Sequence, residues 1–170
     1  MDFLDLVKCR YSVRAYEDRP VEPDKLERVL EAARLAPSGS NRQPWKFVVV
    51  RDAATRHKLI AACCDQDFVG QAPVVIAGVG LMPDRVMRCD VPGDPVDLSI
   101  ALEHIALAAT AEGLGTCWIG AFVQDKVRAV LGIPATAKVI EVMALGYPAD
   151  QLGPKNRKAL GEIICYDRWS

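Results

Sequence analysis

The sequence has few residues from which a metal centre or a disulfide framework could be built. It contains only two histidines, and no carboxylate cluster lies near either one. The six cysteines include no Cys-x-x-Cys pair, and the adjacent Cys63 and Cys64 are poorly spaced for a shared metal. We expect reduced thiols and no metal site.

Strong net charge and long apolar runs are also absent. The formal net charge is −1 at pH 7, so no global basic field could hold nucleic acid or an anionic membrane surface. The first ten residues, MDFLDLVKCR, contain no apolar run typical of a secretory signal. We therefore expect a cytoplasmic protein that binds neither nucleic acid nor membrane.

Common nucleotide and nucleophile motifs are incomplete. Gly78 and Gly80 follow an apolar run, but Pro83 stands where a dinucleotide fingerprint needs its third glycine. No serine has a glycine two residues to either side, and neither Gly-Lys-Ser nor Gly-Lys-Thr occurs. A dinucleotide fingerprint, a serine nucleophile elbow and a phosphate-binding P-loop are therefore excluded.

Hydrophobic periodicity predicts helices and strands within one domain of residues 1–170. Apolar residues at helical spacing between proline and glycine breaks indicate helices, and short β-branched runs indicate strands. The expected helices lie near residues 3–8, from Pro23 to before Pro37, and at 53–62, 97–114 and 123–131; the expected strands are 45–50, 73–79, 116–119 and 139–147. This mixture predicts an α+β domain in three layers, with a strand order that the sequence does not determine.

Two segments and the overall composition refine this prediction. The runs 45–50 and 73–79 are short, largely apolar and bounded by turn-forming residues, which is typical of central strands buried on both faces. Residues 82–96 hold three prolines, one glycine and several charges, so we expect a mobile excursion that could form a substrate lid. The apolar content of 51% leaves a surplus that a second subunit could cover.

Four polar stretches could carry chemistry, and the first is Arg10-Tyr-Ser-Val-Arg14. It offers two guanidinium groups and the Ser12 hydroxyl just after a helix. Such a set suits a phosphate or another anion. A solvated basic turn is the alternative.

The second stretch is the loop Pro37-Ser-Gly-Ser-Asn-Arg-Gln-Pro44. The side chains of Ser38, Ser40, Asn41 and Gln43 can both donate and accept hydrogen bonds, as reading the edge of a heterocycle requires. The same residue types are usual in an ordinary connecting loop, so both interpretations stay open.

The third stretch, Gly113 to Gly120, has glycines on both sides of a short strand. Accessible backbone N–H groups near its end would let a flat ring approach closely. A plain helix-to-strand turn with Trp118 in the core is the alternative.

The fourth stretch is Gly146-Tyr-Pro followed by Lys155, Arg157 and Lys158. A phosphate carries roughly −1.5 to −2 charges and is best neutralised by about two cations. Lys155 and Arg157 could provide them together with Arg10, whereas a flexible solvated tail is the alternative.

These four stretches together resemble the motifs of the nitroreductase family. In order they read Arg-x-Ser-x-Arg, Ala-Pro-Ser-x-x-Asn-x-Gln-Pro-Trp, Gly-Leu-Gly-x-x-Trp-Ile-Gly, and Gly-Tyr-Pro before Lys-x-Arg, across nearly the whole chain. The resemblance implies a three-layer α/β/α fold with a central, mostly antiparallel sheet. It also implies a homodimer around the long central helix, two FMN sites built from both subunits, and a C-terminal segment, Gly161 to Trp169, that adds a strand to the partner's sheet.

The resemblance also implies roles for individual residues. Arg10, Ser12, Lys155 and Arg157 would hold the FMN phosphate, and Arg14 would face the pyrimidine end of the ring. The remaining contacts would come from Pro37, Ser38, Ser40, Asn41 and Gln43, from the other subunit or along the ring edge, and from Trp118, Ile119 and Gly120 near N5. Cys9 departs from the pattern, because the family often has a second basic residue there.

The implied activity is electron transfer from NADH or NADPH through FMN to an electron-poor small molecule, such as a nitroaromatic or a quinone, by a ping-pong mechanism. No catalytic residue is expected beyond the flavin itself. A non-catalytic flavin-storing or redox-sensing protein, and a specialised reductive enzyme of the same family, are the alternatives. The short segment Met82 to Val96 leaves the substrate open.

Overall fold

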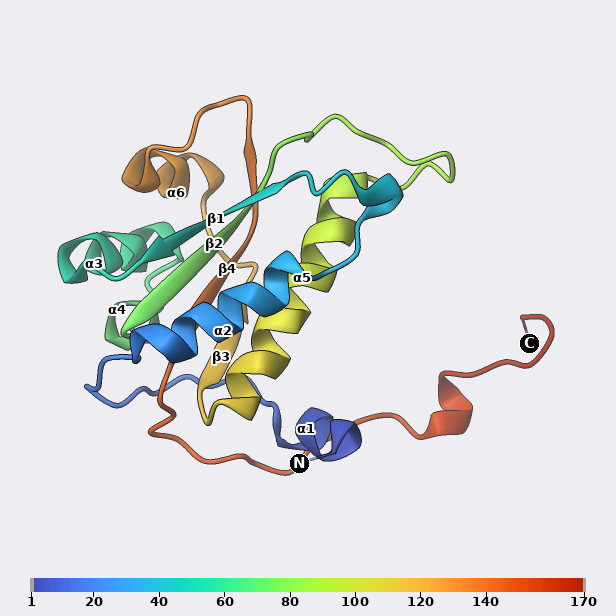
Figure 1. The fold of residues 1–170 in the computed structure, drawn as a ribbon, viewed down its shortest axis with the longest axis horizontal. Coiled ribbons are helices and arrows are strands. Elements are labelled where there is room, and N and C mark those ends of the chain that lie inside the picture. The colour runs from blue at the N-terminus through green and yellow to red at the C-terminus, as the bar shows by residue number, and fades with distance from the viewer. Residues whose placement is uncertain (1, 170) are drawn as a thin grey trace.

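A computed structural model describes residues 2–169, which form three layers around a central sheet (Figure 1). The sheet contains β1 (Trp45–Val50), β2 (Val74–Gly80), β4 (Lys138–Gly146) and β3 (Gly115–Ile119), in that spatial order. Every neighbouring pair is antiparallel. The α+β, three-layer architecture expected from the sequence is confirmed.

Helices cover both faces of the sheet (Figure 1). The long α5 (Gly93–Ala111) and α2 (Pro23–Arg34) lie on one face, and α3 (Ala53–Ala62), α4 (Phe68–Gln71) and α6 (Gln124–Leu131) lie on the other. Because side chains alternate along a strand, the sheet contributes to two separate cores.

Strand β2 contributes side chains to both cores and is buried along its whole length. Its Val75 and Ala77 pack in the core beneath α3, α4 and α6, whereas Ile76 packs beneath α2 and α5. On α5, Leu102 and Ile105 are completely buried. Burial of each such side chain stabilises the fold by roughly 1.5–3 kcal/mol. Helix α5 is therefore held firmly against the sheet.

Helix α1 (Phe3–Cys9) lies beside α5, and the C-terminal segment lies beside α1 at Lys155. Helix α1 begins at Asp2, whose side chain accepts a hydrogen bond of 2.8 Å from the Asp5 N–H. The C-terminal segment passes α1 and then extends away from the rest of the molecule (Figure 1), with one short 3-10 turn at Leu160–Glu162. Phe3 on α1 is 66% exposed, so its apolar side chain has little cover within one chain.

Three details differ from the sequence prediction. Helix α4 was not predicted, because four residues carry no readable periodicity. Helix α5 begins at Gly93 and not at Asp97, so part of the expected excursion is helical. Strand β1 lies at the edge of the sheet, so the prediction of a central position is wrong. An apolar run indicates that the faces of a strand are covered, but it does not indicate whether a neighbouring strand pairs with each of its edges.

The excursion itself is a closed turn in the structure. Val86 and Pro92 form an isolated antiparallel bridge, and the Met87 N–H donates a hydrogen bond of 2.8 Å to the carbonyl of Val91. The segment therefore returns directly to the start of α5.

Within residues 2–169, no helix is long and apolar enough to cross a membrane.

Candidate functional site

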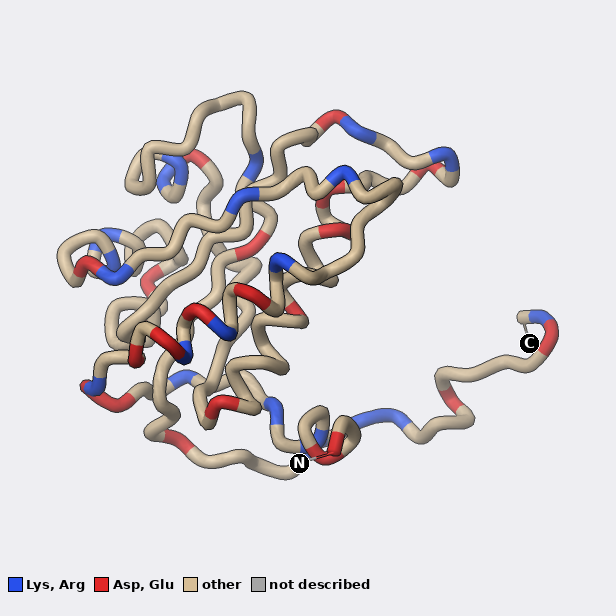
Figure 2. Tube along the Cα trace, viewed as in Figure 1, with Lys and Arg blue, Asp and Glu red and all other residues tan. Residues whose placement is uncertain are grey.

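The first and fourth polar stretches meet at the start of β3. A parallel bridge between Ser12 and Thr116 fixes the first stretch against the sheet. The Lys155 ammonium donates hydrogen bonds to the carbonyls of Val7, at 2.7 Å, and Arg10. These bonds bring the basic part of the C-terminal segment beside the end of α1 (Figure 2).

A cavity of about 200 Å³ lies between these two segments. It is lined by Arg10, Tyr11, Ser12, Arg14, Leu152, Gly153, Pro154, Lys155 and Arg157. Among residues 2–169, the only ion pair that involves any of these cations joins Arg10 Nε to Glu103 Oε1 at 3.7 Å. Burial lowers the pKa of Lys155, and the charges of Arg10 and Arg157 lower it further. This surplus of positive charge favours an anion such as a phosphate.

Asp150 fixes the backbone of this cavity, and sequence reasoning missed it. Its carbonyl and Oδ1 accept hydrogen bonds from the Tyr11 hydroxyl at 2.9 and 3.1 Å, and its Oδ2 accepts one of 2.8 Å from the Arg14 N–H. The pKa of Tyr11 is raised to about 12, mainly by burial and to a smaller extent by the hydrogen bond to Asp150. Tyr11 and Asp150 are 139 positions apart, so no local pattern could have predicted the pair.

The third stretch forms β3 and leaves the strand at Gly120. Ile119 is 2% exposed and packs in the core on the α6 side, so only its backbone could meet a ligand. Trp118 is partly buried against the opposite core, and Gly120 is exposed. At about 3.3 Å per residue, Gly120 lies roughly 13 Å along the strand from Thr116. An anion site and an open backbone therefore lie at the two ends of one strand.

A half-buried carboxyl group faces the Gly120 end. Glu141 on β4 lies across from Gly120, where an ideal Cβ would be 3.7 Å from Glu141 Oε1. Burial raises the pKa of Glu141 to about 7, and the backbone N–H of Ile119 offsets part of this effect. Sequence reasoning missed this residue, and the only available signal was a single charge within an apolar strand.

The second stretch is a strained loop before β1. Ser40, Asn41 and Gln43 have φ values of 55°, 52° and 50°, in the left-handed region that non-glycine residues seldom adopt. The Ser38 hydroxyl accepts a hydrogen bond of 2.9 Å from the Gln43 N–H, and Gln43 Nε2 donates one of 3.2 Å to Asn41 Oδ1. Such strain concentrates at functional sites, because the surroundings must maintain it. Pro37 precedes the loop and is exposed.

Within one chain, this loop does not meet the cationic cavity. The Gly39 N–H donates a hydrogen bond of 2.9 Å to Asp97 in the second turn of α5, whereas the cavity adjoins Glu103 further along that helix. The loop and α1 lie at opposite ends of α5 (Figure 1). The structure therefore divides the predicted site residues into two groups.

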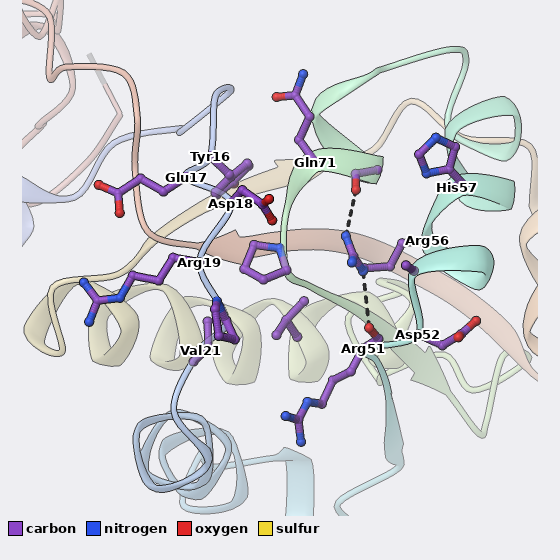
Figure 3. A pocket seen from close by; sticks show the side chains of 15 residues that line it. Tyr16, Glu17, Asp18, Arg19, Val21, Arg51, Asp52, Arg56, His57 and Gln71 are labelled. Atoms are coloured by element: carbon purple, nitrogen blue, oxygen red, sulfur yellow. Dashed lines mark hydrogen bonds between the residues drawn. The ribbon is translucent and has the colours of Figure 1, made fainter.

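A larger cavity, of about 810 Å³, lies away from both groups (Figure 3). Arg56 in its wall is committed to the backbone, because its Nη1 donates to the carbonyls of Gly70 at 2.7 Å and Ala72. Arg19 pairs with Glu22 at 2.9 Å. The labelled side chains spread in different directions (Figure 3), so this cavity lacks a convergent set of polar groups.

Comparison with known proteins adds independent findings. The model of the Nitroreductase family matches residues 7–66 and 60–147. An NADH dehydrogenase of Thermus thermophilus is 32% identical over an alignment that covers 92% of each chain. A nitroreductase family protein of Clostridium difficile 630 is 34% identical with a TM-score of 0.89, covering 99% of this chain and 100% of that one. An FMN-dependent nitroreductase of C. difficile R20291 is 26% identical with a TM-score of 0.84, covering 98% and 100%.

The family model alone spans most of the chain, and the solved structures reproduce its fold over nearly its full length. The motifs that resembled the family are the same stretches that form the cationic cavity, the strained loop and the glycine end of β3. This chain belongs to the nitroreductase family.

Proposed function

We propose that this chain is an FMN-dependent oxidoreductase that passes electrons from NADH or NADPH to an electron-poor small molecule, such as a nitroaromatic or a quinone. The observation that carries the proposal is the cationic cavity at one end of β3, with the open Gly120 backbone at the other. Membership of the family and the FMN-dependent relative in C. difficile support it.

The residues present fit the cofactor. Arg10, Ser12, Lys155 and Arg157 would hold the phosphate, because their cavity has more positive than negative charge. Arg14 would face the pyrimidine end of the ring. Trp118 and the backbone of Ile119 and Gly120 would line the ring near N5. Bound FMN would supply the hydride-accepting chemistry, while the protein binds it, orients it and limits access of water.

The loop from Pro37 to Gln43 would reach the ring from a second subunit. Within one chain the loop and the cavity lie at opposite ends of α5, so a complete site needs the loop of a second chain. In a two-fold dimer around α5, the loop of each chain would approach the cavity of the other. The single domain of residues 1–170 would then form half of each of two sites.

The C-terminal segment would add a strand to the partner's sheet. Trp169 is 94% exposed, and Tyr166 and Ile163 are also exposed. The edge strand β1 borders an apolar cavity of about 250 Å³ formed with α2, which could receive such side chains. Deleting residues 159–170 should convert a dimer into a monomer in analytical ultracentrifugation and abolish FMN retention. A shortened chain that remains dimeric would exclude the exchange.

The kinetic mechanism would be ping-pong, because donor and acceptor would use the same open face of the flavin in turn. Steady-state rates at several acceptor concentrations should give parallel double-reciprocal lines, and intersecting lines would contradict this mechanism.

A cytoplasmic location is supported by the free thiols of Cys9, Cys63, Cys64, Cys89 and Cys117, since disulfides are rare in that compartment.

The deciding experiment is FMN binding by the double variant Arg10→Ala/Arg157→Ala. Each lost charge-assisted hydrogen bond is worth roughly 1.5–3 kcal/mol, so the variant should lose FMN on gel filtration while its unfolding curve changes little. The control Arg51→Ala/Lys58→Ala removes the same charge from exposed positions after β1 and on α3 and should retain FMN. Retention of FMN by the first variant would refute the assignment.

Anaerobic addition of NADH or NADPH to the FMN-loaded wild type separates an enzyme from a store or sensor. Bleaching of the flavin absorption, followed by its return when a quinone is added, supports turnover. A yellow protein that neither nucleotide bleaches would favour the flavin-storing or redox-sensing alternative.

A further inference from the structure

A buried ionic cluster lies where α5 begins. Asp94 and Asp97 are 1% and 2% exposed, and the Arg85 guanidinium forms an ion pair with Asp97. Arg85 Nε also lies 3.7 Å from Asp94 Oδ1. Buried charges are costly unless they are paired, so two carboxylates around one guanidinium indicate a site that the fold maintains for a reason.

The backbone closes directly on these charged groups. A Cβ at Gly93 would overlap the Arg85 guanidinium, and a Cβ at Gly80 would lie 2.5 Å from Asp94 Oδ2. A Cβ at Gly39 would lie 3.3 Å from Arg85 Nη1. Glycine is therefore needed where β2 ends and where α5 begins, and it is favoured in the loop.

Each carboxylate also holds the backbone of a different segment. Asp94 Oδ2 accepts a hydrogen bond of 2.7 Å from the Met82 N–H, at the start of the excursion. Asp97 Oδ1 accepts one of 2.9 Å from the Gly39 N–H, in the strained loop. The two aspartates are alike in burial and charge, but they hold different parts of the molecule.

The strained loop has few other external bonds. Among residues 38–43 of the described chain, the remaining hydrogen bonds stay within the loop or join it to the adjacent Trp45. Three non-glycine residues there have positive φ, and each such conformation costs roughly 1–3 kcal/mol, so it persists only when the surroundings hold it. The hydrogen bond from the Gly39 N–H to Asp97 therefore holds the strained loop against the rigid helix α5.

We propose that Asp97, fixed by Arg85, is a positioning residue that holds the loop from Pro37 to Gln43 in the conformation that contacts the FMN ring. It would not touch the cofactor, and Asp94 would serve the excursion instead. The inference rests on the proposed FMN site. It adds that FMN affinity depends on a buried ion pair outside the site.

The test compares FMN dissociation constants, measured by quenching of flavin fluorescence, for matched variants. Asp97→Ala should weaken FMN binding by about ten- to a hundredfold, because the loop loses its bond to a charged acceptor. Asp94→Ala removes an equally buried carboxylate and should stay within about threefold of the wild type. Asp97→Asn keeps an acceptor for the Gly39 N–H but loses the charge that pairs with Arg85, so its FMN affinity should lie between those of the wild type and Asp97→Ala.

Amide hydrogen exchange of the cofactor-free proteins gives an independent measurement. Exchange at Gly39 and the next residues should accelerate in Asp97→Ala and not in Asp94→Ala. If Asp97→Ala does not fold, Arg85→Gln replaces it, with faster exchange in the loop and weaker FMN binding expected.

Three results would overturn the inference while the proposed function stands. These are wild-type affinity in Asp97→Ala, wild-type affinity in its replacement Arg85→Gln, and equal loss of affinity in Asp94→Ala and Asp97→Ala. Failure of the proposed function is distinguishable, because the wild type itself would then not bind FMN through Arg10 and Arg157.

Discussion

Replacing Glu141 by Gln should make the cofactor-free protein more stable at alkaline pH. Burial raises the pKa of Glu141 from its ordinary value of 4.5 to about 7. Below pH 4.5 the carboxyl is protonated in both the folded and the unfolded chain. Between pH 4.5 and 7 the unfolded chain releases a proton that the folded chain keeps, so the free energy of unfolding falls as pH rises.

The magnitude follows from the two pKa values. Each pH unit corresponds to 1.36 kcal/mol, so the full difference amounts to about 3 kcal/mol, complete above about pH 7. Glu141 is only half-buried, and solvent screening reduces the expected effect to about 1–2 kcal/mol. Gln has the shape of the protonated acid and does not titrate, so the variant should escape this loss.

Urea unfolding at pH 5 and pH 8 measures the effect. Glu141→Gln should exceed the wild type by about 1–2 kcal/mol at pH 8 and by a small fraction of that at pH 5. Glu27→Gln, which changes an exposed carboxyl on α2, serves as the matched control. A stability difference for Glu141→Gln that is the same at both pH values, or larger at pH 5, would refute the reasoning.

Two further predictions concern the flavin. Gly120→Ala should leave the unfolding curve of the cofactor-free protein within about 0.5 kcal/mol, since the new Cβ meets Glu141 only at ordinary contact distance, but should weaken FMN binding at least tenfold in a fluorescence titration. Gly115→Ala should instead destabilise the fold, because its Cβ would overlap Val13, and equal behaviour of the two variants would contradict this argument. Arg14→Gln should lower the two-electron potential of bound FMN by roughly 30–65 mV in a dye-equilibrium titration, if its charge stabilises the reduced ring by roughly 1.5–3 kcal/mol; an unchanged potential would place Arg14 away from the ring.

The sequence predicted the elements well where they are long and periodic. Helices α2, α3 and α6 and the four strands lie within one or two residues of their expected bounds. It was less reliable at α4 and at the start of α5. Helix α4 has only four residues, which are too few to show a helical period of apolar residues. The first turn of α5 contains a glycine and a proline, and these residue types indicate a loop when their packing is not known.

The sequence by itself determined the three layers and the motifs that identify the family, because each is a local pattern of residue types. Only the tertiary structure decided that Lys155 meets Arg10, that Asp150 holds Tyr11, and that the strained loop lies away from the cationic cavity. The burial of Glu141 and the ionic cluster around Arg85 also emerged only there. The physical reason is that burial and pairing depend on neighbours distant in the chain, whose positions no local pattern contains.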